Sequence, residues 1–520
     1  MKRLLLLCLL LAGPARAETV LRYAPLGDLR ILDPIWTSAA ITLSHGQMIY
    51  DVLVTTDSKL VPKLQMAESV ETSADGLRWT FRLRPGLVFH DGQKVTARDV
   101  IASLSRWGKR VTAGQALFAR VASLNAIDDR TLELVLARPF GPVLEALSSP
   151  VLAPFVMREA DAATDAFKQV TTTVGSGPFV FVQSEFQAGN KVVYRKFPGY
   201  VPRQEPADFY SGGKVVNVDR VEWLYLPDPA TAMGALQTGE VDIVASVSPD
   251  FLPVLRARKD LVVQVLDRIG QIGTIRPNAA HLPFSDKRAR QALTLLVDQP
   301  EFAQALAGGA EFGRECFAVF VCGTPNETDF GAAKWKKPNI ALAKKLLAEA
   351  GYKGEKLVLL DPADQPDIHI MALLTADALR KAGVAVDVQT MDWSTVLTRR
   401  NNRDLPSANP AGWDIAFTFW GGLSLASPLT NAPLVSSCDG KNLYGWPCDP
   451  EIERLRAAFT DATDPATRKS VIEALQVQFY EAAPYVSTGL FFRPMAYRAN
   501  LRGLLATPYP VMWNVARTGP

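Results

Sequence analysis

The chain has 520 residues, 48% of them hydrophobic, with 56 basic and 53 acidic side chains. This length exceeds one ordinary domain, so we expect two lobes or more. The near balance of charge argues against a nucleic-acid-binding or membrane-surface protein, because either class would carry an excess of Lys and Arg. Beyond the amino terminus, no segment has the length and apolarity of a transmembrane helix.

Residues 1–17 have the pattern of a secretory signal peptide. A basic start precedes an apolar core over residues 4–12 and a small-x-small cleavage site that ends at Ala17. The apolar run is too short to span a bilayer. Cys8 lies inside that core, without the small residues that precede a lipidated cysteine. We therefore expect an exported protein without a lipid anchor, located in the periplasm. Cleavage would remove three basic residues and leave 53 of each sign.

Four cysteines remain after residue 17: Cys316, Cys322, Cys438 and Cys448. An even number in an exported protein indicates two disulfides. Pairing Cys316 with Cys322 and Cys438 with Cys448 is the simplest of three possibilities, and each bridge would contribute roughly 2–3 kcal/mol. A zinc site is the alternative, but neither spacing is C-x-x-C and no histidine lies close by. We expect no metal and no cofactor.

Mixed helix and strand signals begin near the amino terminus. A strand is predicted to start at residues 20–23, and residues 79–84 and 131–136 alternate apolar and polar side chains like half-buried strands. Residues 81–92 read as strand, Pro-Gly turn, short strand and Asp-Gly turn, followed by a helix. Thr96 can cap that helix, with Asp99 in its electropositive first turn.

Later segments continue the mixed pattern. Residues 175–179 form a glycine-rich turn into a strand, and no Gly-Lys-Ser/Thr follows, which disfavours a phosphate loop. One helix is predicted to end at Gly239 and another, over residues 342–352, at Gly351. Predicted strands at residues 358–360 and 384–388 flank a helix over 371–381. This βαβ pattern predicts parallel sheet.

Four motifs occur in an order that resembles the extracytoplasmic solute-binding proteins of family 5. These proteins deliver peptides, nickel chelates, opines and related solutes to ABC importers. The motifs are residues 81–100, the Gly-Ser-Gly-Pro-Phe element at 175–179, the Ala-Leu-x-x-Gly-Glu-x-Asp element at 235–242, and residues 283–293. Each is weakly specific alone, but they occur in the family's order, and the resemblance covers nearly the whole chain after residue 17.

The resemblance implies an α/β, two-lobed periplasmic binding protein fold of the class with an extra subdomain (cluster C). Two crossover strands, near residues 269–278 and 485–493, would form the hinge. Lobe I would comprise residues 18–270, with the subdomain at about 66–190, completed by residues 490–520. Lobe II would comprise residues 271–489. The solute would lie between the lobes, and hinge closure would bury it.

The implied function is that of the periplasmic substrate-binding component of an ABC importer. Its partners would be a small-molecule solute and an inner-membrane permease with its ATPase, with no nucleic acid, and the protein would be a monomer. A chemoreceptor role could coexist with transport. An exported hydrolase is the alternative of another class, although the four histidines are widely separated and no catalytic motif occurs.

We expect an arginine, several tryptophans and the small residues near them to contact the ligand. Arg276, after the first crossover, is placed to bind a carboxylate through two parallel hydrogen bonds, a surface or hinge ion pair being the alternative. Trp36 and Trp393 are aromatic candidates whose alternative is packing. Trp446 could face either the cleft or the disulfide-bounded loop. The expected ligand-binding residues are Trp36, Thr37, Ser38, Arg276, Asn278, Trp393, Trp420, Gly421, Gly422 and Trp446.

The residues that follow Trp420 bear on the kind of solute. Peptide-binding members of the family carry an aspartate there, which receives the peptide's α-ammonium group, whereas this chain has Leu423 and no acid before Asp439. An unpaired buried ammonium costs several kcal/mol. Gly421 and Gly422 leave room beside the Trp420 ring. We therefore expect a small, non-peptide organic solute that carries a carboxylate; a di- or oligopeptide is the alternative.

Overall fold

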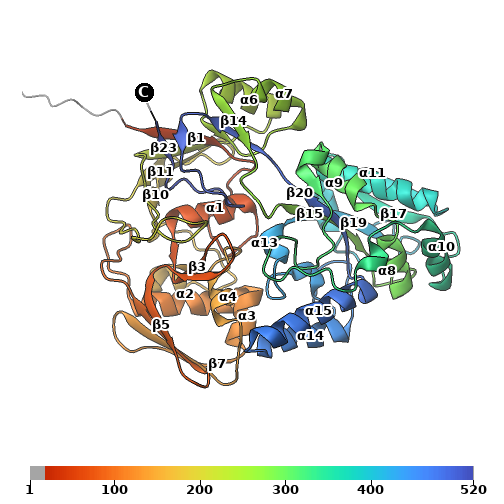
Figure 1. Ribbon diagram of the computed structural model, residues 1–520, viewed down its shortest axis with the longest axis horizontal. Helices are drawn as coiled ribbons and strands as arrows, with labels where there is room; N and C mark the ends of the chain where they lie inside the picture. The colour runs from red at the N-terminus through yellow and green to blue at the C-terminus, as the bar shows by residue number, and fades with distance from the viewer. Residues whose placement is uncertain (1–17, 519–520) are drawn as a thin grey trace, which may run out of the picture.

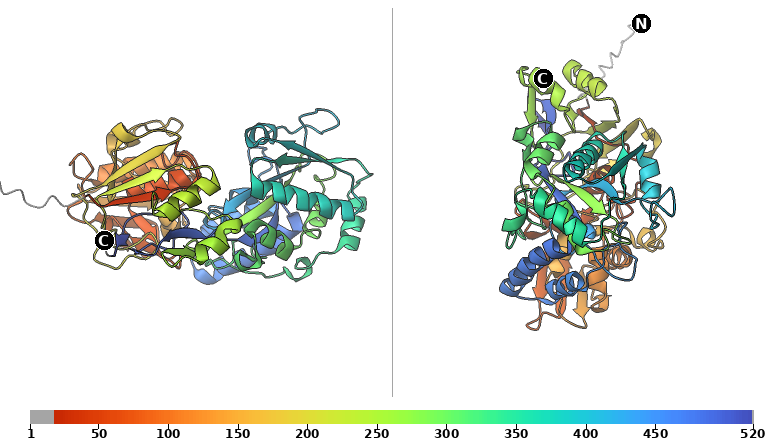
Figure 2. Two further views of the ribbon diagram at one scale, coloured as in Figure 1. Left: turned by 90° about the horizontal axis from the view of Figure 1, so that it is seen from above. Right: turned by 90° about the vertical axis from the view of Figure 1, so that its right-hand side faces the viewer.

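The computed structural model describes residues 18–518, so the predicted signal peptide lies outside the described residues. Two main β-sheets organise two lobes, which lie side by side when the molecule is seen from above (Figure 2, left). The fold is mixed α/β, as the sequence predicts. None of the helices in the described residues is both long enough and apolar enough to cross a membrane.

The first lobe is built on a seven-stranded sheet (Figure 1). Its central strand pairs in parallel with both neighbours, and the outer strands are antiparallel. In spatial order the strands are β10 (Phe179–Phe181), β11 (Lys191–Lys196), β12 (Arg220–Leu224), β1 (Val20–Ala24), β13 (Ile243–Val244), β21 (Met495–Arg498) and β14 (Leu261–Gln264).

The second lobe is built on a six-stranded sheet. In spatial order its strands are β16 (Gly313–Arg314), β20 (Val486–Phe491), β15 (Gln271–Pro277), β19 (Ile415–Gly421), β17 (Leu357–Pro362) and β18 (Val386–Met391). Strand β17 pairs in parallel with β18. Helix α11 (Pro366–Lys381) connects them, which confirms the predicted βαβ unit. The helix begins earlier than predicted, because Pro366 suits the first helical turn, where an N–H has no partner.

The chain crosses between the two sheets twice. It passes from β14 to β15, and it returns from β20 to β21. The strands on either side of the crossings are also partners: β14 pairs with β21 in the first sheet, and β15 pairs with β20 in the second. The two connections therefore run next to each other in opposite directions.

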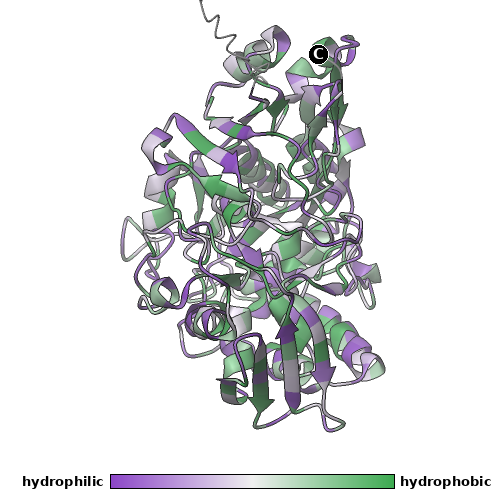
Figure 3. Cartoon of the chain, turned by 90° about the vertical axis from the view of Figure 1, so that its left-hand side faces the viewer, coloured by the Kyte–Doolittle hydropathy of each residue, from purple (hydrophilic) through white to green (hydrophobic). Residues whose placement is uncertain are grey.

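A small subdomain of the first lobe carries an antiparallel four-stranded sheet. Its strands, in spatial order, are β5 (Ala67–Thr72), β6 (Arg78–Leu83), β8 (Thr131–Leu136) and β7 (Val121–Ala126). Strand β8 alternates buried and half-buried residues, as its sequence predicts, because one face of the sheet packs against the core. Figure 3 shows hydrophobic and hydrophilic residues alternating along these strands at the bottom of the view.

The remaining elements cover the sheets or connect them. The helices of the first lobe and its subdomain are α1 (Ala40–Ile49), α2 (Ala97–Arg110), α3 (Thr112–Phe118), α4 (Val143–Ser148), α5 (Glu159–Ala162), α6 (Pro229–Thr238) and α7 (Leu252–Arg256). Those of the second lobe, besides α11, are α8 (Lys287–Thr294), α9 (Gln299–Ala307), α10 (Ile340–Glu349), α12 (Trp393–Arg399), α13 (Gly422–Leu425), α14 (Pro450–Asp461) and α15 (Pro465–Ala482).

Short elements complete the description. The two-stranded pairs are β2 (Asp51–Val52) with β9 (Phe155–Val156), β3 (Val54–Thr56) with β4 (Pro62–Leu64), and β22 (Leu501–Arg502) with β23 (Ala516–Arg517). The 3-10 helices are η1 (Gln183–Glu185), η2 (Pro249–Phe251), η3 (Ala310–Phe312), η4 (Ala333–Trp335) and η5 (Ala432–Leu434).

The motif at residues 81–100 stabilises the start of the subdomain helix α2. The Asp99 carboxylate accepts hydrogen bonds from the Thr96 N–H at 2.8 Å and the Thr96 hydroxyl at 2.7 Å, which is the predicted capping arrangement. His90 joins this motif to the glycine-rich turn: its Nε2 lies 3.1 Å from the Gly177 carbonyl oxygen, and its Nδ1 accepts the Gly175 N–H at 3.1 Å. Burial lowers the pKa of His90 to about 4.

Both disulfides have the predicted pairing. Cys316 is bonded to Cys322 with a Cα–Cα distance of 5.7 Å, and Cys438 to Cys448 with a Cα–Cα distance of 4.6 Å. Within residues 18–518, no group of three or more His, Cys, Asp or Glu side chains is placed to hold a metal ion.

Candidate functional site

A cavity of about 960 Å³ lies between the two lobes, beside the two crossings; we call it the cleft cavity. Its lining comes from three sources: the first lobe, the second lobe and the crossings themselves. The first lobe contributes residues 23, 25–28, 30, 38–41, 44, 245, 495 and 507–510, and the second lobe residues 365, 368, 393, 400, 418–421, 424, 443 and 444. Asp267, Gln271 and Arg493 come from the crossings or their edges.

The second lobe supplies an aromatic wall. Phe419 and Trp420 lie at the end of β19, and Trp393 lies at the start of α12. The Asp392 side chain caps α12 by accepting the Thr395 N–H at 3.0 Å, which fixes the position of the Trp393 backbone. Tyr444 completes the wall. Such rings offer apolar faces to a flat or hydrocarbon part of a ligand.

Arg400 places a positive charge on this wall. Its guanidinium carbon lies 4.2 Å from the centroid of the Tyr444 ring and 5.3 Å from that of the Trp393 ring. Its Nε is buried and has no hydrogen-bond partner. Among residues 18–518, no carboxylate forms an ion pair with it. The guanidinium is thus held by aromatic faces and is not neutralised by the protein.

A second arginine, Arg493, lies where the chain returns to the first lobe. Its Nε donates a hydrogen bond to the side-chain oxygen of Gln271 at 3.0 Å, and its guanidinium pairs with Asp367. Burial lowers the pKa of Arg493 to about 10. Since Asp367 neutralises much of this charge, Arg493 ties α11 to the crossing and leaves Arg400 as the unpaired cation of the wall.

Four of the ten residues expected at the ligand line the cleft cavity: Ser38, Trp393, Trp420 and Gly421. The structure brings them together from the first lobe, α12 and β19. The other six lie outside the lining: Trp36, Thr37, Arg276, Asn278, Gly422 and Trp446.

Arg276 is buried in the second lobe, with 3% of its surface exposed. Its Nε donates to the Tyr444 carbonyl oxygen at 2.9 Å, and one Nη donates to the Pro433 carbonyl oxygen at 2.6 Å. Arg276 stands five positions after Gln271 on the same strand, an odd number, so the two side chains project from opposite faces of β15. Arg276 thereby supports the loop that carries Tyr444. Its contacts differ from both the expected carboxylate clamp and the alternative ion pair.

Asn278 and Trp36 have equally local contacts. The amide nitrogen of Asn278 donates to the Trp413 carbonyl oxygen at 3.0 Å. The ring of Trp36 lies under the guanidinium of Arg110, which is 3.9 Å from the ring centroid and belongs to α2. Thr37 accepts the Ala39 N–H at 3.2 Å, just before α1. Trp36 and Thr37 thus hold the loop whose next residue, Ser38, reaches the cavity.

The adjacent glycines have different surroundings. A Cβ on Gly421 would meet only the Tyr509 hydroxyl, at 3.8 Å, so this position leaves open space in the cavity. A Cβ on Gly422 would lie 2.5 Å from Cγ2 of Ile269, because Gly422 packs directly on the first crossing. Trp446 lies in the loop closed by the second disulfide, where Arg403 stands 4.6 Å from its ring centroid.

Leu423, on α13, is buried in a hydrophobic cluster that consists mainly of first-lobe residues. From this short helix, only Ser424 lines the cleft cavity. No carboxylate therefore reaches the cavity from the segment after Trp420, as the sequence indicates. The carboxylates that do line it, Asp28 and Asp267, come from other segments.

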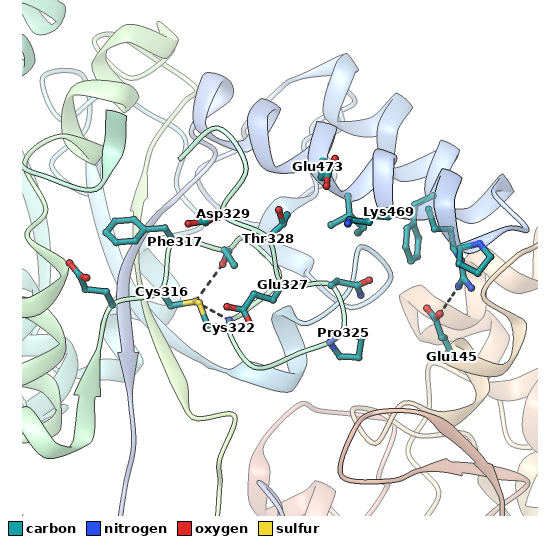
Figure 4. Close-up of a pocket in the computed structure, with 17 residues that line it drawn as sticks. Glu145, Cys316, Phe317, Cys322, Pro325, Glu327, Thr328, Asp329, Lys469 and Glu473 are labelled. Atoms are coloured by element: carbon teal, nitrogen blue, oxygen red, sulfur yellow. Dashed lines mark hydrogen bonds and ion pairs between the residues drawn. A yellow bond between two sulfur atoms is a disulfide. The ribbon is translucent and has the colours of Figure 1, made fainter. Parts of the chain in front are cut away.

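A second cavity, of about 860 Å³, shares no lining residue with the cleft cavity. It is bounded by the subdomain helix α4, the helix α15 and the loop of the Cys316–Cys322 bridge (Figure 4). At its edge Glu145 pairs with Arg468 at 2.5 Å, a contact that joins the subdomain to the second lobe. It lacks the aromatic wall and the unpaired guanidinium of the cleft cavity.

Sequence reasoning missed several residues of the cleft cavity: Asp267, Gln271, Arg400, Arg493 and Tyr509. Helical spacing could have found Arg400, because it follows Trp393 by seven residues, or two helical turns, and so shares its face. Tyr509 lies in a segment without regular structure and offers no periodic signal.

Comparison with known proteins identifies relatives along nearly the whole chain. The sequence profile described as "Bacterial extracellular solute-binding proteins, family 5 Middle" matches residues 61–434. A probable peptide ABC transporter periplasmic-binding protein of Sinorhizobium fredii is 36% identical over 507 residues, which cover 96% of this chain and 94% of that protein.

Solved structures share the fold. A periplasmic binding protein in complex with agropinic acid, from Agrobacterium tumefaciens R10 as its description gives the source, superposes with a TM-score of 0.78 at 22% identity, covering 96% of this chain and 99% of that one. A dipeptide-binding protein of Pseudoalteromonas sp. SM9913, in complex with Met-Leu, superposes with a TM-score of 0.76 at 22% identity, covering 96% and 100%.

Proposed function

Since the chain belongs to family 5 of the bacterial extracellular solute-binding proteins, we propose that it captures a small organic carboxylate in the cleft cavity. The chain is the solute-binding component of an ABC transporter. In this proposal it works in the periplasm as a monomer and delivers its solute to an inner-membrane permease with its ATPase.

The observation that carries the proposal is Arg400. An arginine that lines a cavity without a carboxylate partner is an anion site, because desolvating an unpaired charge costs several kcal/mol that a bound anion offsets. Its planar fork suits a carboxylate, and each charge-assisted hydrogen bond contributes about 1.5–3 kcal/mol. The aromatic wall around it would contact the apolar part of the same solute.

The position of Leu423 favours a non-peptide solute. A peptide held by its α-ammonium group would find no carboxylate in the segment that follows Trp420, since Leu423 is buried and apolar. The solute named for one relative, agropinic acid, is such an organic acid. A di- or oligopeptide is the alternative, in keeping with the peptide-binding role named for the Sinorhizobium relative and the Met-Leu bound to another.

Hinge closure would bury the solute. We take residues 18–270 with 490–520 as lobe I, with its subdomain at about 66–190, and residues 271–489 as lobe II. The membership of β14 and β21 in one sheet and of β15 and β20 in the other supports this division. Of the residues expected at the ligand, Ser38, Trp393, Trp420 and Gly421 stay in the proposal, and Arg400 takes the role expected of Arg276. In the same proposal, the protein binds the solute without converting it chemically.

The test is to identify what the protein binds. Solute released from the purified, denatured protein is analysed by mass spectrometry, and melting temperatures are measured with agropinic acid, other small carboxylates, free Met-Leu and N-acetyl-Met-Leu. Carboxylates should raise the melting temperature by mass action, and they should be recovered chemically unchanged. Tight binding of free peptides, abolished by N-acetylation, would instead establish the peptide alternative.

A further inference from the structure

The first crossing brings one carboxylate into the cleft cavity. Asp267 lies between β14 and β15 and lines the cavity together with Gln271 and Tyr509. Its Oδ1 accepts the backbone N–H groups of Ile269 and Gly270, each at 3.0 Å. These two bonds hold the carboxylate in one orientation at the hinge end of the cavity. Its other oxygen has no hydrogen-bond partner in the described chain.

Asp267 differs from other shielded aspartates of the same lobe. Asp33 pairs with Arg106 at 2.6 Å, Asp51 with Lys214 at 2.9 Å, and Asp242 with Arg517 at 2.6 Å. Asp267 forms no ion pair within residues 18–518.

The groups around Asp267 do not neutralise it either. Tyr210 and Tyr509 lie near enough to feel its charge, and burial raises the pKa of both phenols, so that they stay uncharged. Arg268, its neighbour in the chain, is exposed and makes no ion pair with it. Burial accordingly raises the pKa of Asp267 to about 6, against the two backbone hydrogen bonds, which lower it.

The turn at Asp267 does not require a charge. An asparagine or serine oxygen would accept the same two backbone N–H groups. A charged carboxylate at this point costs stability unless a partner arrives, and Asp267 lines the cavity from which a solute can supply one. Arg400 presents the complementary case, an unpaired cation on the opposite lobe's wall of the same cavity.

We propose that Asp267 binds a cationic nitrogen of the solute, so that the transported solute carries an ammonium, substituted ammonium or guanidinium group as well as a carboxylate. This inference rests on the proposed function, since it concerns the same solute. It assigns the positive group to the hinge end of the cavity, where the turn at Asp267 packs on Gly422 of the segment after Trp420. A solute held between Asp267 and Arg400 contacts the hinge and the second lobe at once.

The substitution Asp267→Asn tests the inference, because asparagine keeps the turn and removes only the charge. Melting temperatures and titration calorimetry are measured with matched pairs of non-peptide solutes that differ in one ammonium group: phenylalanine with 3-phenylpropanoate, and 4-aminobutanoate with butanoate. The ammonium-bearing member should bind the wild-type protein more tightly. Asp267→Asn should weaken the binding of the ammonium-bearing member by roughly 10- to 100-fold and leave the affinity for the other member unchanged. Asp267→Asn should melt no lower than the wild-type protein without solute.

The pH dependence gives a second readout. Phenylalanine stays zwitterionic between pH 5 and 7, and no histidine lines the described cavity, so a loss of its affinity in the wild-type protein below pH 6 reports Asp267. The affinity for Asp267→Asn should be flat over this range.

Three results would contradict the inference or its premise. Equal binding of both members of each pair would overturn it, and so would an ammonium preference that survives in Asp267→Asn. Both results would leave the carboxylate site at Arg400 intact. If Arg400→Met leaves the binding of every carboxylate unchanged, the proposed function itself fails, whatever the behaviour of Asp267→Asn.

Discussion

Arg120 of the subdomain and Asp461 of the second lobe form an ion pair 2.5 Å long across a separation of 341 residues. The same guanidinium donates to the Thr460 hydroxyl at 2.6 Å, and the nearby Gly141 N–H donates to the Thr460 carbonyl oxygen at 2.9 Å. Helix α14, which carries Asp461, lies beside α3 and α4 (Figure 1). The lobes are therefore joined at a second place, far along the chain from the two crossings.

We expect the Arg120 contact to restrict the angle between the lobes. Arg120→Met should lower the free energy of unfolding by about 1–2 kcal/mol, because it leaves Thr460 and Asp461 without their donor. It should also raise the radius of gyration of the solute-free protein in small-angle scattering. The matched control is Arg78→Met, which removes an ion pair to Glu133 within the subdomain. Identical scattering curves for Arg120→Met and wild-type protein would contradict this role.

Removal of the Arg400 charge should weaken carboxylate binding. Arg400→Met keeps the apolar stem against Tyr444 and Trp393 but removes the guanidinium, so affinity should fall roughly 10- to 100-fold, equivalent to about 1.4–2.8 kcal/mol. Titration calorimetry with the panel carboxylate of highest affinity measures the change. Arg380→Met, at an exposed site on α11, is the control and should bind as the wild type does. Unchanged affinity in both variants would exclude Arg400 as the anion site.

The two disulfides should differ in their effect on binding. The Cys438–Cys448 bridge closes the loop that presents Leu443 and Tyr444 to the cleft cavity, whereas the Cys316–Cys322 bridge borders the second cavity. Replacing either pair with alanine should cost roughly 2–3 kcal/mol of stability. Only the loss of Cys438–Cys448 should also reduce solute affinity, as measured by calorimetry. Equal affinities in the two double variants would show that the loop keeps its shape without the bridge.

The histidine in the subdomain motif should make stability depend on pH. The pKa of His90 is about 4 in the folded protein and about 6.5 in an unfolded chain, so between these values the unfolded chain binds a proton that the folded chain does not. His90 therefore lowers stability as pH falls from 6.5 to 4, by up to about 1.4 kcal/mol per pH unit.

Urea unfolding of wild-type protein and His90→Gln at several pH values measures this contribution. The variant should lose less stability over the same range, while at pH 8, where histidine is neutral in both states, any difference between the two proteins reflects hydrogen bonding alone. Parallel stability curves from pH 8 to pH 4 would contradict the low pKa of His90.

Local signals predicted the elements of the fold better than the residues of the site. The cap at Thr96, the helix end at Gly239 and the βαβ unit around α11 follow from short-range chemistry, and each occurs in the structure. The α/β two-lobed fold follows from motif order, which the family profile and the solved structures support.

Which residues line the site depends on the face of the helix or strand from which each side chain projects. Arg276 and Gln271 share a strand, yet only Gln271 lines the cavity. Gly421 and Gly422 are adjacent, yet one borders open space and the other packs on Ile269. Asp267 and Tyr509 meet only after the chain has folded across both lobes, so no spacing along the sequence could have paired them.

The pairing of the two crossings has a mechanical consequence. Two antiparallel connections, each anchored to the other by strand pairing at both ends, behave as a narrow ribbon, which twists and bends easily but resists stretching and sliding. The relative motion of the lobes is then confined to few degrees of freedom. We therefore expect the proposed hinge closure to follow few coordinates, so that contacts formed early in the closure bring the remaining contacts into place.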